Sequence, residues 1–453
     1  MHLMSMKLRH FVCLLCAGIL SVSASAHAAS PPPQGQQATS PAPSAPQPSS
    51  SKDTTASAKE PGSELTVYLL TFGWGDVVWE RFGHNAIWIS DKARHTDITY
   101  NWGMFDFNQP HFVWRFVTGD TRYWMEPIDY LPMVRYYRQQ NRSILAQELN
   151  LTPAQRLKLQ QFVQWNARPE NKFYRYDYYR DNCSTRLRDA LDHALGGQLQ
   201  TATVSLTTTG TYRWHTQRLM TGDIPMYTGI TFALGHPADK PISVWQEMFL
   251  PVRMANDFRQ ISVKDSTGAR IPLVKSEMPI FTAGRSPEPA DAPNYLPLFV
   301  GVGILYAALL LILVRSAEGG SRAALFTATA LAIMWSAIAG LAGAALLFAW
   351  FFTKHYFMGR NENVLHLNPL SLGLIVMIPL AIYARKGTVR ARKLAGLIAV
   401  LCLVGFVAQG IPAFDEKNGE IIALALPINL AVWWTVFRLV SYRRTSLPSS
   451  PAL

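Results

Sequence analysis

Apolar and polar positions divide the 453-residue chain into three regions. Residues 29–63 contain almost no large apolar side chains, and residues 64–281 have the mixed, aromatic-rich pattern of a globular domain. Residues 296–441 consist mainly of long apolar runs separated by short polar loops. Because the Pro, Ser, Ala and Gln residues of 29–63 cannot bury enough surface to fold, we expect this segment to be a disordered tether.

Five apolar runs in the C-terminal region are each close to the ~20 residues that a helix needs to cross a bilayer. They cover residues 296–314, 323–352, 368–384, 394–414 and 420–441. The third run is short and begins with Asn368-Pro369, which makes it the weakest of the five. The pattern predicts an all-α bundle of five transmembrane helices over 296–441, preceded by a linker at 282–295 and followed by a tail at 442–453.

Basic residues are distributed unevenly among the loops of this bundle. If the globular domain is exported, the loops on the opposite side of the membrane and the tail carry most of them: Arg315, Arg322, Arg385, Lys386, Arg390, Arg392, Lys393, Arg438, Arg443 and Arg444. The loops on the side of the domain carry only Lys354, Arg360 and Lys417. The positive-inside rule therefore predicts a bacterial inner-membrane protein with an exported domain and a cytoplasmic C-terminus. This topology accounts for much of the net charge of +12, so we expect no nucleic-acid partner.

The N-terminus has the pattern of a secretory signal peptide. Lys7 and Arg9 precede an apolar run at 11–22, and small residues end in Ala26-His27-Ala28. These are the charged, hydrophobic and A-x-A parts of such a peptide, so residues 1–28 are expected to be removed. An uncleaved anchor helix is the alternative.

The four cysteines are expected to lie in different parts of the protein. Cys13 and Cys16 leave with the signal peptide, and Cys402 lies inside an apolar run. Cys183 remains alone in the exported domain, without a disulfide partner in an oxidising compartment.

Residues 64–281 combine short strands with helices, which is typical of an α+β fold. Helix starts are expected at Thr152-Pro153, with an end near residue 165, and at Asp181-Asn182, with an end at Gly196-Gly197. Strands are expected at 65–70, 85–90, 96–101 and 172–177, with a late hairpin over 261–281 that turns at 265–268.

Cys183 and His84 are the residues in this domain that could carry chemistry. The predicted helix places Cys183 in its first turn, where backbone N–H groups and the helix dipole favour the thiolate. His84 follows Gly83 at the edge of a predicted strand, where another chain or a substrate can approach. A thiol, a base and helix N–H groups that could hold an oxyanion are what nucleophilic acyl chemistry needs.

Less specific interpretations remain open for these and other residues. A free cysteine is often a buried small hydrophobe, although the polar neighbours of Cys183 are unusual for a core position. Asp189 and His193 share a helix face and could bind a metal, but a solvated face fits them better because no further ligands occur at suitable spacing. No metal or cofactor is expected. The aromatic run at 173–179 could stack on bases, lie at a membrane interface or pack in the core, and no role is assigned to it.

Several motifs resemble the Lnb N-terminal periplasmic domain family, over about residues 65–255. They are Phe82-Gly83-His84-Asn85, Tyr100-Asn101-Trp102-Gly103-Met104-Phe105-Asp106-Phe107, Tyr178-Tyr179-Arg180-Asp181-Asn182-Cys183-Ser184-Thr185-Arg186, and Leu234-Gly235-His236-Pro237-Ala238-Asp239 followed by Met248-Phe249-Leu250-Pro251. The polar residues between 353 and 369 are similar to the membrane part of the same family. The tether at 29–63 departs from the pattern.

The resemblance implies a permuted, papain-like fold related to NlpC/P60 thiol enzymes, in which His84 is the base and Cys183 the nucleophile. Asn101, with Asp106 behind it, is the candidate for the residue that orients the imidazole. The implied reaction moves a fatty acyl chain from the diacylglyceryl group of a lipoprotein or a related lipid, through a Cys183 thioester, to an amine. A cell-wall amidase or endopeptidase and a non-catalytic envelope scaffold are the alternatives.

The loop at 354–369 is more polar than a simple connector requires, and the expected topology puts it on the side of the exported domain. It contains amides and imidazoles, which recognise ligands without setting orientation. We therefore predict that His355 and Asn361 contact the head of a lipid or lipoprotein substrate.

Overall fold

The computed structural model describes residues 60–445, and these form two compact units. The first unit contains the described residues up to Phe116, together with Asp120–Gly210 and Pro241–Glu288. The second contains Val117–Gly119, Thr211–Lys240 and the chain from Pro289 onward. The expected signal peptide, nearly all of the expected tether and most of the expected tail lie outside the described residues.

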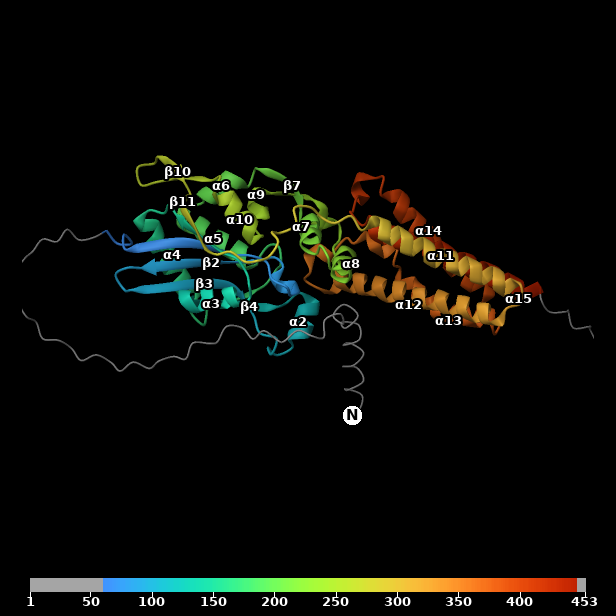
Figure 1. The fold of residues 1–453 in the computed structure, drawn as a ribbon. Coiled ribbons are helices and arrows are strands. Elements are labelled where there is room, and N and C mark those ends of the chain that lie inside the picture. Colours follow the sequence, from blue (N-terminus) through green and yellow to red (C-terminus); the bar gives the residue numbers. More distant parts are fainter. Residues whose placement is uncertain (1–59, 446–453) are drawn as a thin grey trace, which may run out of the picture. The chain divides into compact units, whose positions relative to one another are not determined.

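The first unit is built on an antiparallel sheet with strand order β11-β5-β1-β2-β3-β4-β6 (Figure 1). The strands are β1 (Leu65–Phe72), β2 (His84–Asp91), β3 (Thr96–Met104), β4 (Arg122–Asp129), β5 (Ile144–Leu149), β6 (Phe173–Arg175) and β11 (Val274–Phe281). The four strands expected from the sequence correspond to β1, β2, β3 and β6, so the expected α+β class is confirmed.

The helices of this unit cover both faces of the sheet. They are α2 (Phe112–Thr118), α3 (Tyr130–Gln139), α4 (Pro153–Asn166), α5 (Cys183–Leu195), α6 (Gln198–Thr203), α9 (Val244–Glu247) and α10 (Pro251–Phe258). Alternation along β1 sends Leu69 into the main core beneath α4 and α5 and Leu70 into a smaller core that includes residues of α3. The helix α5 packs against β2 and β3, and this contact positions the candidate site.

Both expected helix starts in the first unit are confirmed, because their capping interactions are local. The Thr152 side chain accepts from the Gln155 N–H and Gln155 bonds back to the Thr152 N–H, while Pro153 occupies the first helical position of α4. The late hairpin is only partly as expected. Strands β9 (Ser262–Lys264) and β10 (Arg270–Pro272) pair around the turn that begins at Asp265, whereas β11 joins the main sheet beside β5.

The second unit is helical. Its long helices are α11 (Leu296–Glu318), α12 (Arg322–Phe352), α14 (Thr388–Ala408) and α15 (Gly419–Thr445), and the shorter ones are α7 (Tyr212–Leu219), α8 (Ile224–Ala233) and α13 (Leu372–Ile382). The four long helices are apolar enough to cross a membrane. The segments Tyr356–Leu365 and Pro369–Ile382 meet at an angle of 53°. Together they would form a fifth, broken crossing of the membrane. The helix α13 alone has 11 residues, which is too short for the ~30 Å hydrocarbon core.

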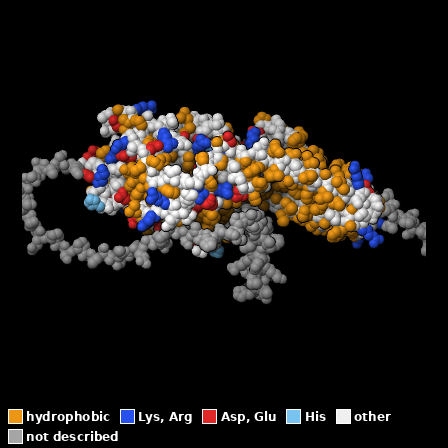
Figure 2. Space-filling model, in the orientation of Figure 1, with side chains coloured by type: hydrophobic (Ala, Val, Ile, Leu, Met, Phe, Trp, Pro, Cys, Tyr) orange, Lys and Arg blue, Asp and Glu red, His pale blue; other side chains and the backbone are white. Residues whose placement is uncertain are grey.

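The surface of the long helices is apolar, as a lipid-facing surface must be. Figure 2 shows hydrophobic side chains along this unit, and the exposed ones include Leu305, Phe326 and Val407. The exposed basic residues Arg322 and Lys386 belong to the loops that the charge pattern assigned to the inner side. The membrane-integral character expected from the sequence is therefore supported.

Residues 211–240, which we expected within the exported domain, pack with the helical unit. The fully buried Arg213 pairs with Asp239 in the same segment at 2.8 Å and with Glu416, in the loop before α15, at 3.3 Å. The side-chain hydroxyl of Tyr227 donates to Glu420 of α15 at 2.7 Å. Buried ion pairs and hydrogen bonds of this kind fix the segment to α15 and to the loop before it, and the apolar periodicity of the sequence does not reveal such contacts.

Candidate active site

Cys183 is the first residue of α5, as the sequence predicted. The Asn182 side chain accepts from the Thr185 N–H at 2.9 Å, and the Thr185 hydroxyl accepts from the Asn182 N–H at 2.7 Å. The Asn182 amide also donates to the carbonyl oxygens of Tyr178 and Phe249, at 3.1 and 3.0 Å. The start of the helix is therefore held in one place by reciprocal capping and by two more distant segments.

The sulfur of Cys183 lies where α5 meets the ends of β2 and β3. Gly103 of β3 has φ +92°, and a Cβ atom added there would approach the Cys183 Cβ to 3.2 Å. Ser184 donates to the Asn85 side chain at 2.8 Å and so ties the helix to β2. Burial raises the pKa of the Cys183 thiol, and the backbone N–H of Asn85 acts in the opposite direction by bonding to the sulfur. The side chain keeps partial exposure, so the group at rest is a reachable, neutral thiol.

His84 begins β2 and bonds to Asn101 of β3. The distance from His84 Nε2 to Asn101 Oδ1 is 3.2 Å. The Asn101 amide nitrogen donates to the backbone oxygen and the hydroxyl of Thr99, at 3.1 and 3.2 Å, so the amide oxygen is the group that faces the ring. Because that oxygen can only accept, Nε2 must donate, and in the neutral imidazole Nδ1 is then the proton acceptor.

Aromatic rings and a cation surround the imidazole. Phe72 and Tyr137 stack with His84 at centroid distances of 5.8 and 6.2 Å. Burial lowers the pKa of His84 to about 4, the bond to Asn101 acts to raise it, and the charge of Arg142 lowers it further. The imidazole is therefore neutral at pH 7 and ready to accept a proton.

Sequence reasoning missed four residues that shape this site: Asn85, Tyr137, Arg142 and Ser184. Arg142 donates to the Gly73 carbonyl at 2.8 Å and lies over the Tyr137 ring at 4.7 Å. Asn85 directly follows His84 in the sequence, but no local feature indicates that it contacts Ser184 and the Cys183 sulfur. Tyr137 and Arg142 come from α3 and the turn after it, and only the folded chain shows that they approach His84.

The structure thus brings His84 and Asn101 into contact and places Cys183 against Asn85, the residue after His84. A direct approach of the Cys183 sulfur to His84 Nδ1 stays a prediction. Asp106 lies in the turn after β3, where it accepts from the Asn108 N–H at 2.8 Å.

The two candidate substrate contacts of the loop belong to the second unit. Asn361 is buried, with 1% of its surface exposed, and donates to the carbonyl oxygens of Phe232 and Ala233, while its oxygen accepts from the Asn363 N–H. A substrate contact would require one of these bonds to break. His355 is half-buried at the end of α12, and its role stays a prediction.

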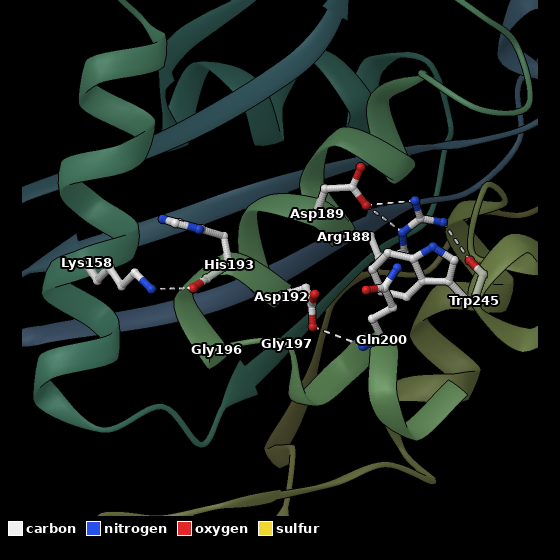
Figure 3. A pocket seen from close by; sticks show the side chains of 9 residues that line it. All are labelled: Lys158, Arg188, Asp189, Asp192, His193, Gly196, Gly197, Gln200 and Trp245. Atoms are coloured by element: carbon white, nitrogen blue, oxygen red, sulfur yellow. Dashed lines mark hydrogen bonds and ion pairs between the residues drawn. The ribbon is translucent and has the colours of Figure 1, made fainter. Parts of the chain in front are cut away.

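A separate pocket of about 500 Å³ lies at the opposite end of α5 (Figure 3). His193, which lines it, is ten residues from Cys183 in sequence, or about 15 Å along the helix. Arg188 donates to Asp189 at 2.7 Å and to the Trp245 carbonyl at 2.6 Å, and Lys158 donates to the His193 carbonyl at 2.6 Å. No group of three or more His, Cys, Asp or Glu side chains within residues 60–445 is placed to hold a metal.

Together these features define a membrane-integral protein whose α+β unit contains a thiol at a helix N-terminus and an imidazole bonded to an asparagine. Comparison with protein families gives two matches: the Lnb N-terminal periplasmic domain over residues 53–219 and the Lnb transmembrane domain over residues 295–438. The chain belongs to the Lnb family, and it is a multi-pass inner-membrane protein with an N-terminal periplasmic domain. No curated protein and no solved structure matches it. The two family matches support a membrane protein that modifies lipoproteins.

Proposed function

We propose that this protein transfers a fatty acyl chain from the diacylglyceryl group of a lipoprotein, or from a related membrane lipid, to an amine. The observation that carries the proposal is the combination of Cys183 at the first position of α5 with an imidazole that Asn101 orients, in a chain with membrane-spanning helices. A wall amidase or endopeptidase would use the same residues, but its substrate does not require such helices.

In the first half of the proposed reaction, His84 Nδ1 takes the thiol proton as the Cys183 sulfur attacks the ester carbonyl. The first-turn N–H groups of α5 stabilise the oxyanion of the tetrahedral intermediate. The C–O bond then breaks, the proton passes from His84 to the departing glycerol oxygen, and the acyl group remains on sulfur as a thioester.

In the second half, an amine attacks the thioester carbonyl. His84 accepts a proton from the attacking nitrogen, the C–S bond breaks, and the proton returns to the Cys183 sulfur. The lowered pKa of His84 keeps the ring neutral at the start of both halves. The products are an amide and the original thiol, so no oxidant, reductant or cofactor is consumed.

The test is acylation of a diacylated lipoprotein by the full chain in nanodiscs, followed by mass spectrometry of the lipoprotein N-terminus. We expect the N-terminal amine to gain one acyl mass with the wild type and with Cys402→Ala, which changes the other cysteine of the described residues. A gain that persists with both Cys183→Ala and His84→Ala would contradict the proposal. Cleavage of peptidoglycan peptides without lipoprotein acylation would identify the amidase instead, and neither reaction would favour the scaffold.

The loop at 354–369 is proposed to hold the head of the lipid donor. Because the Asn361 amide bonds within the protein, His355→Ala is the more selective variant. We expect it to lower acyl transfer without changing the labelling of Cys183 by a small maleimide. Unchanged transfer in this variant, or residue 361 labelled from the cytoplasmic side after replacement by Cys, would contradict this role.

The C-terminus is proposed to be cytoplasmic, as the distribution of Arg and Lys predicts. An alkaline phosphatase fusion after residue 445 should be inactive, and an active fusion would reverse the assignment.

A further inference from the structure

The first unit carries a set of touching aromatic rings that the proposed chemistry does not use. Phe105 lies 5.0 Å from Phe107, 6.2 Å from Phe112 and 5.0 Å from Tyr123, measured between centroids. The set, called the aromatic path below, consists of Trp79, Phe105, Phe107, Phe112, Tyr123 and Tyr176.

One end of the aromatic path is open to solvent. Trp79 and Phe107 are 56% and 57% exposed, and their rings meet edge to face at 5.5 Å. Two large aromatic side chains held together at a surface cost solvation free energy in a soluble protein, and they usually mark a binding surface.

The other end of the aromatic path reaches the candidate nucleophile. Tyr123 and Tyr176 stack at 4.1 Å, and both Tyr176 and Cys183 pack against the main core. Burial raises the pKa of Tyr176, and the charged form of Cys183 acts in the same direction. Phe105 also follows Gly103, the glycine that faces the Cys183 Cβ, by only two residues.

The segment that contains Phe112 continues along the chain into the helical unit. Phe112 begins α2, and the last turn of α2 runs into Val117–Gly119, which belong to the helical unit. There the Lys354 N–H donates to the Thr118 carbonyl at 2.8 Å, two residues beyond the end of α12 at Phe352. Trp and Phe side chains are characteristic of the interface between membrane and water.

We infer that the aromatic path is the surface on which the acyl chain of the donor lies while its ester reaches Cys183. The inference rests on the proposed acyl transfer and names the part of the donor that this surface recognises: a long hydrocarbon chain. A chain several methylenes long follows a continuous row of rings, whereas a short acyl group contacts only the end nearest the sulfur. The path therefore makes the enzyme selective for long acyl chains.

Photo-crosslinking tests the surface without requiring catalysis. The full chain is placed in nanodiscs that contain phosphatidylglycerol with a diazirine in one acyl chain, and the crosslinked peptides are mapped after irradiation. We expect crosslinks on the peptides that contain Trp79 and Phe107, and we expect Trp79→Ala/Phe107→Ala to reduce them at least tenfold. Trp165→Ala is the matched control, because Trp165 of α4 is 49% exposed but lies outside the path.

Thiol acylation by p-nitrophenyl esters separates this inference from the proposed function. The double variant should lose at least tenfold in the rate of Cys183 acylation by the dodecanoate ester and keep the rate with the butyrate ester. Equal effects on both esters, or crosslinks only outside the path, would overturn the inference. If neither ester acylates Cys183 in the wild type, the proposed function fails, and the crosslink map still decides whether the surface binds acyl chains.

Discussion

Each of the two units contains a cysteine and a histidine of interest, and the two pairs differ in burial, in the position of the cysteine on its helix and in the partners of the imidazole. In the helical unit, His366 Nδ1 lies 3.2 Å from Cys402 Sγ, and Asn429 donates to the His366 carbonyl at 2.8 Å. Cys402 and His366 have no exposed surface, and Cys402 lies in the middle of α14. In the periplasmic unit, Cys183 begins its helix and keeps partial exposure.

We infer from this difference that contact between a thiol and an imidazole is not sufficient to make a nucleophile. The N–H groups around Cys402 are used within α14, whereas the first turn of α5 has N–H groups without intrahelical partners. The ring of His84 has its own orienting partner in Asn101, which leaves the other nitrogen for chemistry. We interpret the Cys402 pair as a polar contact that holds the bent segment before α13 within the bundle.

The largest difference in acyl-transfer rate is expected between variants of the two cysteines. Cys183→Ala is expected to lower acyl transfer at least about 1,000-fold, because Cys402, the other cysteine of the described residues, has no exposed surface on which to form the thioester. Cys402→Ala should retain transfer within about threefold whenever the protein inserts. Initial rates of lipoprotein acylation measure both, with thermal unfolding as the check on folding. A larger loss from the Cys402 variant would reverse the assignment of roles.

Loss of the base should have the next largest effect. His84→Ala is expected to reduce kcat/KM by about 10²- to 10⁴-fold, the usual range for a general base. The companion change, His366→Ala, should affect stability more than turnover, since it leaves a cavity beside Cys402. If the folded His84→Ala and His366→Ala variants lost kcat to a similar extent, His84 would not be distinguished from His366 as the base.

The smallest effect is expected for Asn101, because it acts through His84. Asn101→Ala should lower kcat about ten- to a hundredfold by releasing the ring from its orientation. The bond to Asn101 raises the pKa of His84, so its loss should move the acid limb of the rate, expected near pH 4, to lower pH. Asn101→Asp should move that limb to higher pH, since a carboxylate stabilises the imidazolium. Profiles of kcat/KM from pH 8 to pH 4 would show these opposite shifts, and an unchanged limb in both variants would remove Asn101 from the site.

The sequence predicted what depends on local chemistry. The starts of α4 and α5 follow from Thr152-Pro153 and Asn182, whose capping partners lie three residues away. Four apolar runs became long helices because length and composition decide that outcome, whereas the third run, which begins at Asn368-Pro369, formed only the 11-residue helix α13. The choice of Cys183, His84 and Asn101 came from motifs, and the structure shows His84 and Asn101 in contact.

What the sequence could not show depends on long-range packing. Tyr137 reaches His84 only because α3 packs on the sheet, and β11 joins β5 rather than its neighbour in sequence. The polar residues of the loop at 354–369 suggested a solvated ligand site, yet Asn361 uses its amide to hold Phe232 and Ala233. The sequence alone does not distinguish an amide that binds a substrate from an amide that donates hydrogen bonds to buried carbonyl groups.

A trapped acyl-enzyme tests the central claim most directly. The full chain is incubated in nanodiscs with a diacylated lipoprotein whose N-terminal amine has been blocked, so that the second half of the reaction cannot occur. Peptide mass spectrometry should find one fatty acyl mass on Cys183, removable by neutral hydroxylamine as a thioester is, and none on Cys402. An acyl mass on another residue, or an unmodified Cys183 in protein that acylates the unblocked lipoprotein, would contradict the account.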